Sequence, residues 1–430
     1  MQEQTPPRYI PYLPTSFDGA ITLDGSKSIS NRALIILALA DANAAGYLSH
    51  LSTSNDTTTL LRLLNTRNEA HTFDAGDAGT VFRFMAAYLA TRAGTQVLTG
   101  SKRMLERPIG PLVTALRTLG ADIQYLGNEG YPPLQIGPPN ELGKQINTLT
   151  IDAGVSSQFL SALLMIGPYL PNGLTLIPSG KMVSKPYLDM TMGLMTEFGA
   201  HCKWENDHVI VSPGQYTPKS FKVEGDWSAA SYWYSFVALA EKATLRLNGL
   251  FQNSVQGDAV LSKMMQAFGV ETSFDQDGIV ISKTGNSKRL FEWDFLDCPD
   301  IAQTLAVTCA GRGMQGVFTG LETLSIKETD RIAAIKQELA KVGASFVKLP
   351  PHFNKKQPEK IFYMLEGQAK IDADNPPVFE TYGDHRMAMA FAPLALLGNI
   401  IVENPSVVGK SYPSFWEDME VVLSSSIQTF

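Results

Sequence analysis

Cationic and hydroxyl side chains collect within residues 23–40, LDGSKSISNRALIILALA, directly before a run that has no polar side chain. Lys27, Ser28 and Arg32 all lie in this opening. Lys and Arg bind phosphate and carboxylate groups, and the N–H groups at a helix start attract anions as well. The segment therefore predicts an anion-binding helix start. A phosphate-binding loop of the form GxxxxGK[ST] is excluded, because Ser26 stands between Gly25 and the lysine.

Five further segments repeat this arrangement, each with an Asp beside small or polar residues before an apolar run of helix length. The six acids, separated by 53, 75, 74, 74 and 84 residues, are Asp24, Asp77, Asp152, Asp226, Asp300 and Asp384. Polar residues at the later starts include Thr80, Arg83, Ser156, Ser157, Gln158, His385 and Arg386. Asp and Ser are also common N-caps, so each one alone has a structural interpretation, and Asp226 and Asp384 are expected to be caps. Positive charges spread over separate helix starts fit an anion site better.

Asp300 and Glu328 form a pair that could divide the roles of general acid and general base. Glu328 belongs to ETLSIKETDRIAA (322–334), where Ser325 three residues earlier also fits a capping box. Lys327 and Arg331 in the same segment could be ordinary solvated charges. The spacing leaves both interpretations open.

A second kind of helix is predicted between these starts, with apolar residues at intervals of three and four and charges between them. Such stretches are residues 112–126, 191–204, 261–274 and 332–346. Short β-branched segments follow them. The pattern therefore predicts about six repeats. Each would consist of a strand, a buried helix, a strand, an amphipathic helix and further strands. Three repeats in each of two domains is the natural division for 430 residues.

Composition limits the classes of partner and the compartment. Apolar residues make up 44% and charged residues 18%, and the net charge of −7 argues against a general affinity for nucleic acid or anionic membranes. Cys202, Cys298 and Cys309 show no CxxC spacing, and no His-rich motif indicates a metal. We expect a cytoplasmic protein, since no signal peptide or membrane span is evident. We also expect it to be a monomer that binds neither membrane nor nucleic acid and uses no metal or cofactor.

Seven motifs, in order along nearly the whole chain, resemble those of the 5-enolpyruvylshikimate-3-phosphate (EPSP) synthase family. They are GSKSISNRAL (25–34), AGT..R (78–83), RMLERPIG (103–110), SSQ (156–158), VSKPY (183–187), KETDR (327–331) and DHRMAMA (384–390). The resemblance implies an α/β fold of two domains, each of three βαβαββ units forming an inside-out α/β barrel. Helix N-termini would face an interdomain cleft. The domains would be residues 15–225, and residues 1–14 with 226–430, hinged near Thr15 and Glu224.

The resemblance also implies a reaction in which phosphoenolpyruvate donates its enolpyruvyl group to the 5-hydroxyl of shikimate 3-phosphate, releasing phosphate. The implied contacts of shikimate 3-phosphate are Lys27, Ser28, Arg32, Ser156, Ser157, Ser184, Tyr187, Asp300 and Lys327. Those of phosphoenolpyruvate are Lys27, Gly79, Arg83, Arg107, Gln158, Arg331, His385, Arg386 and Lys410. Two anionic substrates without a metal need such a ring of cations and helix dipoles. We expect Asp300 as base and Glu328 as acid, with Lys27 a contender for either proton.

Some positions depart from the family pattern. Asp77 stands where Asn is usual, Phe84 where Pro is usual, and Thr323 where an Asn would contact the substrate ring. The short first separation, together with the stretch NTRNEAHTFD, predicts a trimmed first repeat. Two alternatives remain open. One is the sister enzyme that acts on UDP-N-acetylglucosamine, and the other is an inactive anion-binding homologue.

Overall fold

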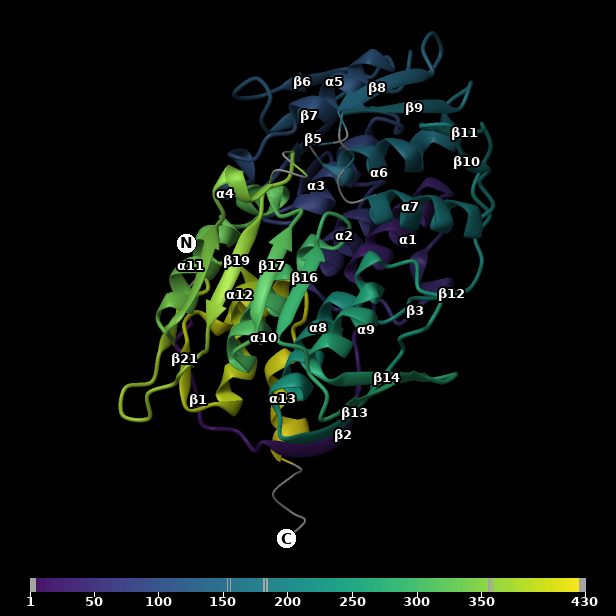
Figure 1. Ribbon diagram of the computed structural model, residues 1–430. Coiled ribbons are helices and arrows are strands. Elements are labelled where there is room, and N and C mark those ends of the chain that lie inside the picture. Colours follow the sequence, from purple (N-terminus) through teal and green to yellow (C-terminus); the bar gives the residue numbers. More distant parts are fainter. Residues whose placement is uncertain are drawn as a thin grey trace. The chain divides into compact units, whose positions relative to one another are not determined.

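The structure, a computed structural model, describes residues 5–152, 154, 156–180, 182, 185–354, 357 and 359–424. The chain divides into two compact units, which we call the first unit (residues 25–223) and the second unit (residues 1–24 with 224–430). Each unit has its own hydrophobic core. In the ribbon diagram the first unit runs from purple to teal, and most of the second runs from teal to yellow (Figure 1).

The first unit contains helices and strands in alternation. Its helices are α1 (Lys27–Leu39), α2 (Asn55–Asn65), α3 (Gly79–Leu89), α4 (Lys102–Leu105), α5 (Gly110–Thr118), α6 (Ser157–Ile166) and α7 (Lys185–Glu197). Its strands are β3 (Leu48–Ser49), β4 (Thr72–Asp74), β5 (Gln96–Thr99), β6 (Ile123–Tyr125), β7 (Leu134–Ile136), β8 (Thr148–Asp152), β9 (Leu174–Ser179), β10 (Cys202–Glu205), β11 (His208–Val211) and β12 (Phe221–Lys222).

The second unit repeats this alternation. Its helices are α8 (Trp227–Leu239), α9 (Leu261–Met264), α10 (Ala302–Arg312), α11 (Arg331–Ala340), α12 (His385–Phe391) and α13 (Phe415–Ser424), with 3-10 helices that include η3 (Gly257–Val260), η5 (Pro299–Ile301), η6 (Glu322–Ile326) and η9 (Pro405–Lys410). Its strands are β1 (Arg8–Ile10), β2 (Ser16–Thr22), β13 (Lys242–Asn248), β14 (Val270–Phe274), β15 (Gly278–Lys283), β16 (Leu290–Asp294), β17 (Gln315–Thr319), β18 (Ala344–Lys348), β19 (Tyr363–Gly367), β20 (Val378–Phe379) and β21 (Ile400–Val402).

The sheets confirm the repeat expected from the sequence. Four of them have four strands, in the orders β4-β5-β7-β6, β10-β11-β9-β8, β16-β17-β19-β18 and β14-β15-β13-β2. In three of them the parallel pair consists of the two strands that flank a buried helix, α3, α6 or α10. In the fourth, β13 follows α8 and runs parallel to β2. An antiparallel hairpin completes each sheet. Within the described ranges, the sheet of the first repeat has two strands, β12 and β3. The predicted trimming of that repeat is therefore confirmed.

Strand β2 shows where the chain leaves the second unit. It pairs in parallel with β13 along its whole length, from Ser16 opposite Lys242 to Thr22 opposite Asn248 (Figure 1). The sequence predicted the boundary between the two domains after residue 14, which is before β2 begins. The ladder with β13 places β2 in the second unit, so that the break between the compact units falls after Asp24. At the other crossover the break falls after Val223.

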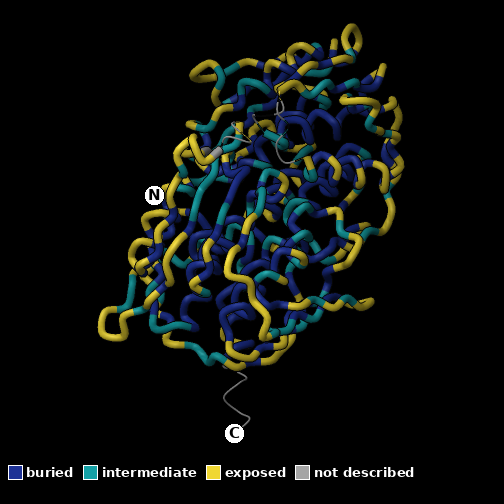
Figure 2. Tube along the Cα trace, in the orientation of Figure 1, coloured by how far each residue is buried: buried dark blue, intermediate teal, exposed yellow. Residues whose placement is uncertain are grey.

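Three helices form the centre of each unit because their sequences are apolar on every side. Helices α1, α3 and α6 contact one another in the first unit, as do α8, α10 and α12 in the second. The exposed residues lie mostly on the sheets, loops and amphipathic helices around them (Figure 2). No helix in the described part of the chain is long and apolar enough to cross a membrane.

Gly25 illustrates how tightly the start of the first unit is packed. A Cβ atom at this position would lie 1.9 Å from the carbonyl oxygen of His50 and 3.1 Å from the carbonyl carbon of Leu51. Both are backbone atoms, so no rotamer change can relieve the contact. Residue 25 must therefore be glycine for the chain to enter α1 in this way.

We expect Gly25→Ala to destabilise the first unit by about 2 kcal/mol and to lower its Tm by roughly 5 °C, because overpacking against backbone must displace main chain. Thermal unfolding followed by circular dichroism measures the change. Gly46→Ala is the matched control, since a Cβ atom there has no neighbour within 4 Å. Equal Tm values for the two variants would contradict the packing argument.

Candidate active site

The side chain of Arg331 is the centre of a charged cluster in the second unit. Its guanidinium group donates from Nε to Asp384 Oδ2 (2.7 Å), from Nη1 to Asp300 Oδ1 (3.1 Å) and from Nη2 to Glu328 Oε2 (2.9 Å). The side chain is 2% exposed. Hydrogen bonds between ions are the strongest in proteins, and a buried ion requires such partners. One cation thus holds three carboxylates from different elements together, and we call these four residues the Arg331 cluster.

Further cations surround the Arg331 cluster. Arg386 Nη2 lies 3.0 Å from Asp300 Oδ2, and Lys327 Nζ lies 3.7 Å from Asp300 Oδ1. Lys410 Nζ, at the end of η9, lies 3.3 Å from Glu328 Oε1. Four cations therefore face three carboxylates, which leaves a positive excess next to the two candidate acid–base residues.

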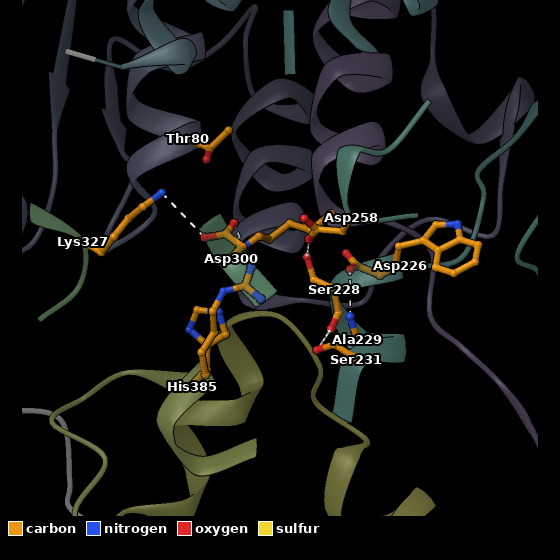
Figure 3. A network of polar contacts seen from close by, with 12 residues as sticks. Thr80, Asp226, Ser228, Ala229, Ser231, Asp258, Asp300, Lys327 and His385 are labelled. Atoms are coloured by element: carbon orange, nitrogen blue, oxygen red, sulfur yellow. Dashed lines mark hydrogen bonds and ion pairs between the residues drawn. The ribbon is translucent and has the colours of Figure 1, made fainter. Parts of the chain in front are cut away.

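The helix starts of the second unit position these groups. Asp300 lies in η5, directly before α10, and Arg331 is the first residue of α11, whose N-cap is Asp330. Asp384 caps α12 by accepting a hydrogen bond from the backbone N–H of Arg386 (2.9 Å). His385 follows Asp384 and is buried, with its Nδ1 3.5 Å from the Oδ1 atom of that aspartate. Figure 3 shows Asp300, Lys327 and His385 in this network.

Both candidate acid–base residues are ionised in the free protein. Burial alone would raise the pKa of Asp300, but Arg386, Lys327 and Arg331 outweigh it and hold that pKa well below its usual range. Burial likewise opposes ionisation of Glu328, while Arg331 and Lys410 hold its pKa well below its usual range. The cluster therefore presents two carboxylates, each of which can accept a proton.

The capping-box interpretation of Glu328 is wrong. The N-cap of α11 is Asp330, whose side chain accepts hydrogen bonds from Ile332 N and Ala333 N. Ser325 instead donates from its hydroxyl to the carbonyl of Glu322. Asp226 caps α8 as expected, accepting from Ala229 N. Asp384 is a cap as expected and, in addition, a partner of Arg331, which the sequence did not indicate.

Arg32 occupies a different environment in the first unit. It is buried, and its guanidinium group donates to the Thr191 hydroxyl (2.7 Å), the Ser28 carbonyl (2.9 Å) and the Ser161 hydroxyl (3.1 Å). The carbonyl of Tyr187 lies 3.5 Å from Nη2. Among the residues the structure describes, Arg32 has no carboxylate partner. Burial lowers the pKa of Arg32 to about 10, so the group is still charged at neutral pH.

Two aromatic rings lie against this cation. The guanidinium carbon of Arg32 is 5.3 Å from the ring centroid of Phe84 and 5.7 Å from that of Tyr187. Cation–π contacts at such distances stabilise a cation without neutralising it. Phe84, where the family pattern has Pro, thus contacts a residue expected to bind shikimate 3-phosphate.

Lys27, at the start of α1, pairs with an acid that the sequence did not identify. Its Nζ lies 3.5 Å from Oδ2 of Asp56, which is buried in the first turn of α2. An Asp in that turn cannot be told from an ordinary helix-start acid by sequence alone. Asp56 was therefore missed because only the fold brings α1 and α2 together.

Gly79 begins α3 and lies beneath two guanidinium groups. A Cβ atom there would come within 2.6 Å of Arg107 Nη1 and 2.9 Å of Arg83 Nη1, so these arginines approach the backbone because residue 79 is glycine. Arg83 is buried and donates to the carbonyls of Gly79 (3.0 Å) and Pro108 (3.3 Å). Two cations thus converge on one helix start.

The start of α6 supplies further polar groups. Ser156 is its N-cap and accepts from the N–H of Gln158 (3.2 Å), and Ser157 is its first residue. The side chain of Gln158 donates to the Thr80 hydroxyl on α3 (3.0 Å). Ser184 lies outside the described residues. The first unit thus brings hydroxyl, amide and guanidinium groups together at the starts of α1, α3 and α6, an arrangement suited to phosphate and carboxylate groups.

Comparison with known proteins shows which family this chain is similar to. A family profile described as EPSP synthase (3-phosphoshikimate 1-carboxyvinyltransferase) matches residues 65–419. A 3-phosphoshikimate 1-carboxyvinyltransferase of Bacteroides fragilis is 44% identical over 96% of this chain and 97% of its own. One from Neisseria gonorrhoeae is 35% identical over 95% and 96%. The fold is similar to that of EPSP synthase from Acinetobacter baumannii, with a TM-score of 0.76 at 22% identity over 97% of this chain and 99% of that one.

Replacing Arg331 by Met should leave three buried carboxylates short of a cation. We expect a loss of about 3–5 kcal/mol in the free energy of unfolding of the second unit at pH 7. The loss should shrink below about pH 5, because the carboxylates of the variant gain protons and stop repelling one another. Denaturant unfolding at several pH values measures this.

Arg246→Met is the control, because Arg246 also binds carboxylates, those of Asp275 and Asp277, but at the surface. Its removal should leave the stability nearly unchanged. An Arg331 variant as stable as this control would show that the cluster does not depend on its central cation.

Proposed function

The chain belongs to the EPSP synthase family, and on this premise we propose that it transfers the enolpyruvyl group of phosphoenolpyruvate to the 5-hydroxyl of shikimate 3-phosphate. The products are 5-enolpyruvylshikimate 3-phosphate and phosphate. The observation that carries the proposal is the convergence of Asp300 and Glu328 on one buried guanidinium group with a positive excess around it. Addition and elimination each require a proton donor and a proton acceptor.

Each substrate is assigned a set of residues. For shikimate 3-phosphate they are Lys27, Ser28, Arg32, Ser156, Ser157, Ser184, Tyr187, Asp300 and Lys327. For phosphoenolpyruvate they are Lys27, Gly79, Arg83, Arg107, Gln158, Arg331, His385, Arg386 and Lys410. The charge of Arg32 supports its assignment, because its partners in the described part of the chain are neutral and a buried cation of this kind favours an anionic ligand.

Arg331 requires a more specific role than the other cations. Three carboxylates of the protein already bind its guanidinium group. Arg331 would therefore hold Asp300 and Glu328 in place as well as attract the donor. Arg386 and Lys410, each with one carboxylate partner in the cluster, would supply direct contacts to phosphoenolpyruvate.

Asp300 would act as the base in the addition step. Its ionised carboxylate takes the proton of the 5-hydroxyl as that oxygen bonds to C2 of phosphoenolpyruvate, and the methylene carbon C3 gains a proton from an acid. Glu328 is the proposed acid. It is ionised in the free protein, so we infer that it takes up a proton when the anionic donor binds, since added negative charge raises the pKa of a nearby carboxyl.

The elimination step reverses these transfers. A proton leaves C3, the bond from C2 to the phosphate oxygen breaks, and the double bond forms again. Glu328 would accept the proton from C3, while cations of the cluster stabilise the departing phosphate. Lys27, held near Asp56, is the alternative carrier of either proton.

No group of three or more His, Cys, Asp or Glu side chains in the described ranges is arranged to hold a metal ion. In the proposed mechanism Lys and Arg side chains and helix starts stabilise all the negative charges of the two substrates. We further propose that the protein acts as a monomer in the cytoplasm, without a nucleic-acid partner, in agreement with its net charge of −7.

The acceptor can be identified by phosphate release from phosphoenolpyruvate. With shikimate 3-phosphate we expect continuous turnover, and with UDP-N-acetylglucosamine no release above that seen without an acceptor. Both acceptors should be tried at saturating donor concentration. Turnover with the UDP-sugar alone would reject the proposed function, and normal binding without turnover would favour an inactive homologue.

Glu328→Gln tests the acid assignment. The amide cannot donate a carboxyl proton to C3, so kcat should fall by at least about 100-fold, while the Kd of shikimate 3-phosphate changes by less than about threefold. Steady-state kinetics and calorimetry measure the two quantities. Glu322→Gln, in the exposed part of the same segment, is the control. Survival of kcat within a few-fold would remove Glu328 from the mechanism.

A further inference from the structure

Asp258 is a buried carboxyl group beside the Arg331 cluster that no substrate assignment uses. It lies in η3 and is 6% exposed. Its Oδ2 accepts a hydrogen bond from the hydroxyl of Ser228, in the first turn of α8 (Figure 3). Its charged neighbours are Asp300 from η5, Arg386 from α12 and Asp226 at the N-cap of α8.

Asp258 differs from the other acids of this region in its partners. Asp300, Glu328 and Asp384 each pair with a cation within 4 Å. Within the described residues Asp258 has no ion pair, and Ser228 is its hydrogen-bond donor. A carboxylate buried without a cation is costly, so such a group keeps its proton to a higher pH.

We propose that Asp258 is a positioning residue whose protonated form leaves Arg386 directed at Asp300 and the anionic donor. The ionised form of Asp258 adds a negative charge beside Arg386 and Asp300 and weakens the binding of phosphoenolpyruvate. The statement about the donor rests on the proposed function. The statement about the ionisation of Asp258 does not.

The pH at which this change occurs lies near neutrality. Burial raises the pKa of Asp258 to about 7, the negative charge of Asp300 adds to the rise, and the Ser228 hydroxyl opposes it. Below that pH the group is neutral. Above it, a second carboxylate competes for Arg386 and repels phosphoenolpyruvate. The Cys298 thiol senses the same charge, since burial raises its pKa and Asp258 raises it further.

Asp258→Asn is the principal variant, because the amide has the shape of the protonated acid and cannot ionise. From pH 6 to pH 8.5 the KM of the unmodified protein for phosphoenolpyruvate should rise about fivefold more than that of the variant, the effect of one added charge in a partly screened site. At pH 6 the two proteins should agree. Asp275→Asn, a surface carboxylate change in the same unit, should keep the unmodified profile.

Stability provides a readout that needs no substrate. The folded protein retains the Asp258 proton up to about pH 7, whereas the unfolded chain loses it near pH 4. The folded state therefore binds more protons in this window, and stability falls as pH rises through it. The Tm of Asp258→Asn minus that of the unmodified protein should increase from pH 5 to pH 8.

The ionisation itself can be observed by NMR with ¹³Cγ-labelled Asp, in which the resonance absent from Asp258→Asn is the one to follow. We expect its midpoint near pH 7 and a higher midpoint in Ser228→Ala, which lacks the hydroxyl donor. A midpoint below pH 5, or identical pH profiles of KM in the variant and the unmodified protein, would overturn the proposal. A midpoint near pH 7 in a protein with no activity toward shikimate 3-phosphate would reject the proposed function and leave the assignment of Asp258 standing.

Discussion

The buried guanidinium group of Arg331 is the interaction on which the arrangement of the second unit's candidate site depends. It joins Asp300 before α10, Glu328 before α11 and Asp384 at the start of α12. Desolvating four charges is unfavourable unless each has a partner at hydrogen-bond distance. Helix starts that lie far apart in the sequence are thereby fixed next to one another. The same interaction keeps both carboxylates ionised in the free protein, which suits Asp300 as a base and means that Glu328 must take up a proton before it can act as an acid.

The buried arginines of the two units, Arg331 and Arg32, have opposite kinds of partner. Arg331 is neutralised by acids of its own unit, whereas Arg32 is held by hydroxyls, carbonyls and two aromatic rings. The first arrangement fixes carboxylates for proton transfer. The second leaves a positive charge that no carboxylate in the described part of the chain neutralises, and an anionic substrate can supply the counter-ion. Asp258 is a third case, a buried acid that forms no ion pair among the residues the structure describes and accepts a hydrogen bond from Ser228.

Much of the fold could be predicted from the sequence because its signals are local. An apolar run such as residues 33–39 must be buried on every side. Asp226 and Asp384, each directly before such a run, cap their helices as expected. Repetition of this pattern gave the number of repeats and the division into three and three, which the sheets confirm. The break after Asp24, which the sequence placed after residue 14, was less predictable, because β2 belongs to the second unit through a ladder with β13, more than 200 residues away in sequence.

The sequence by itself determined which elements form and which helix starts carry charge, since capping, periodicity and apolar runs act within a few residues. Only the tertiary structure decided which charges meet. The sequence around Glu328 fits a capping box equally well, but in the fold Asp330 is the N-cap and Glu328 lies beside Arg331 and Lys410. Asp56 gains significance only next to Lys27. The physical reason is that a pKa or an ion pair depends on distances of a few ångströms between side chains, and folding alone sets those distances for residues remote in sequence.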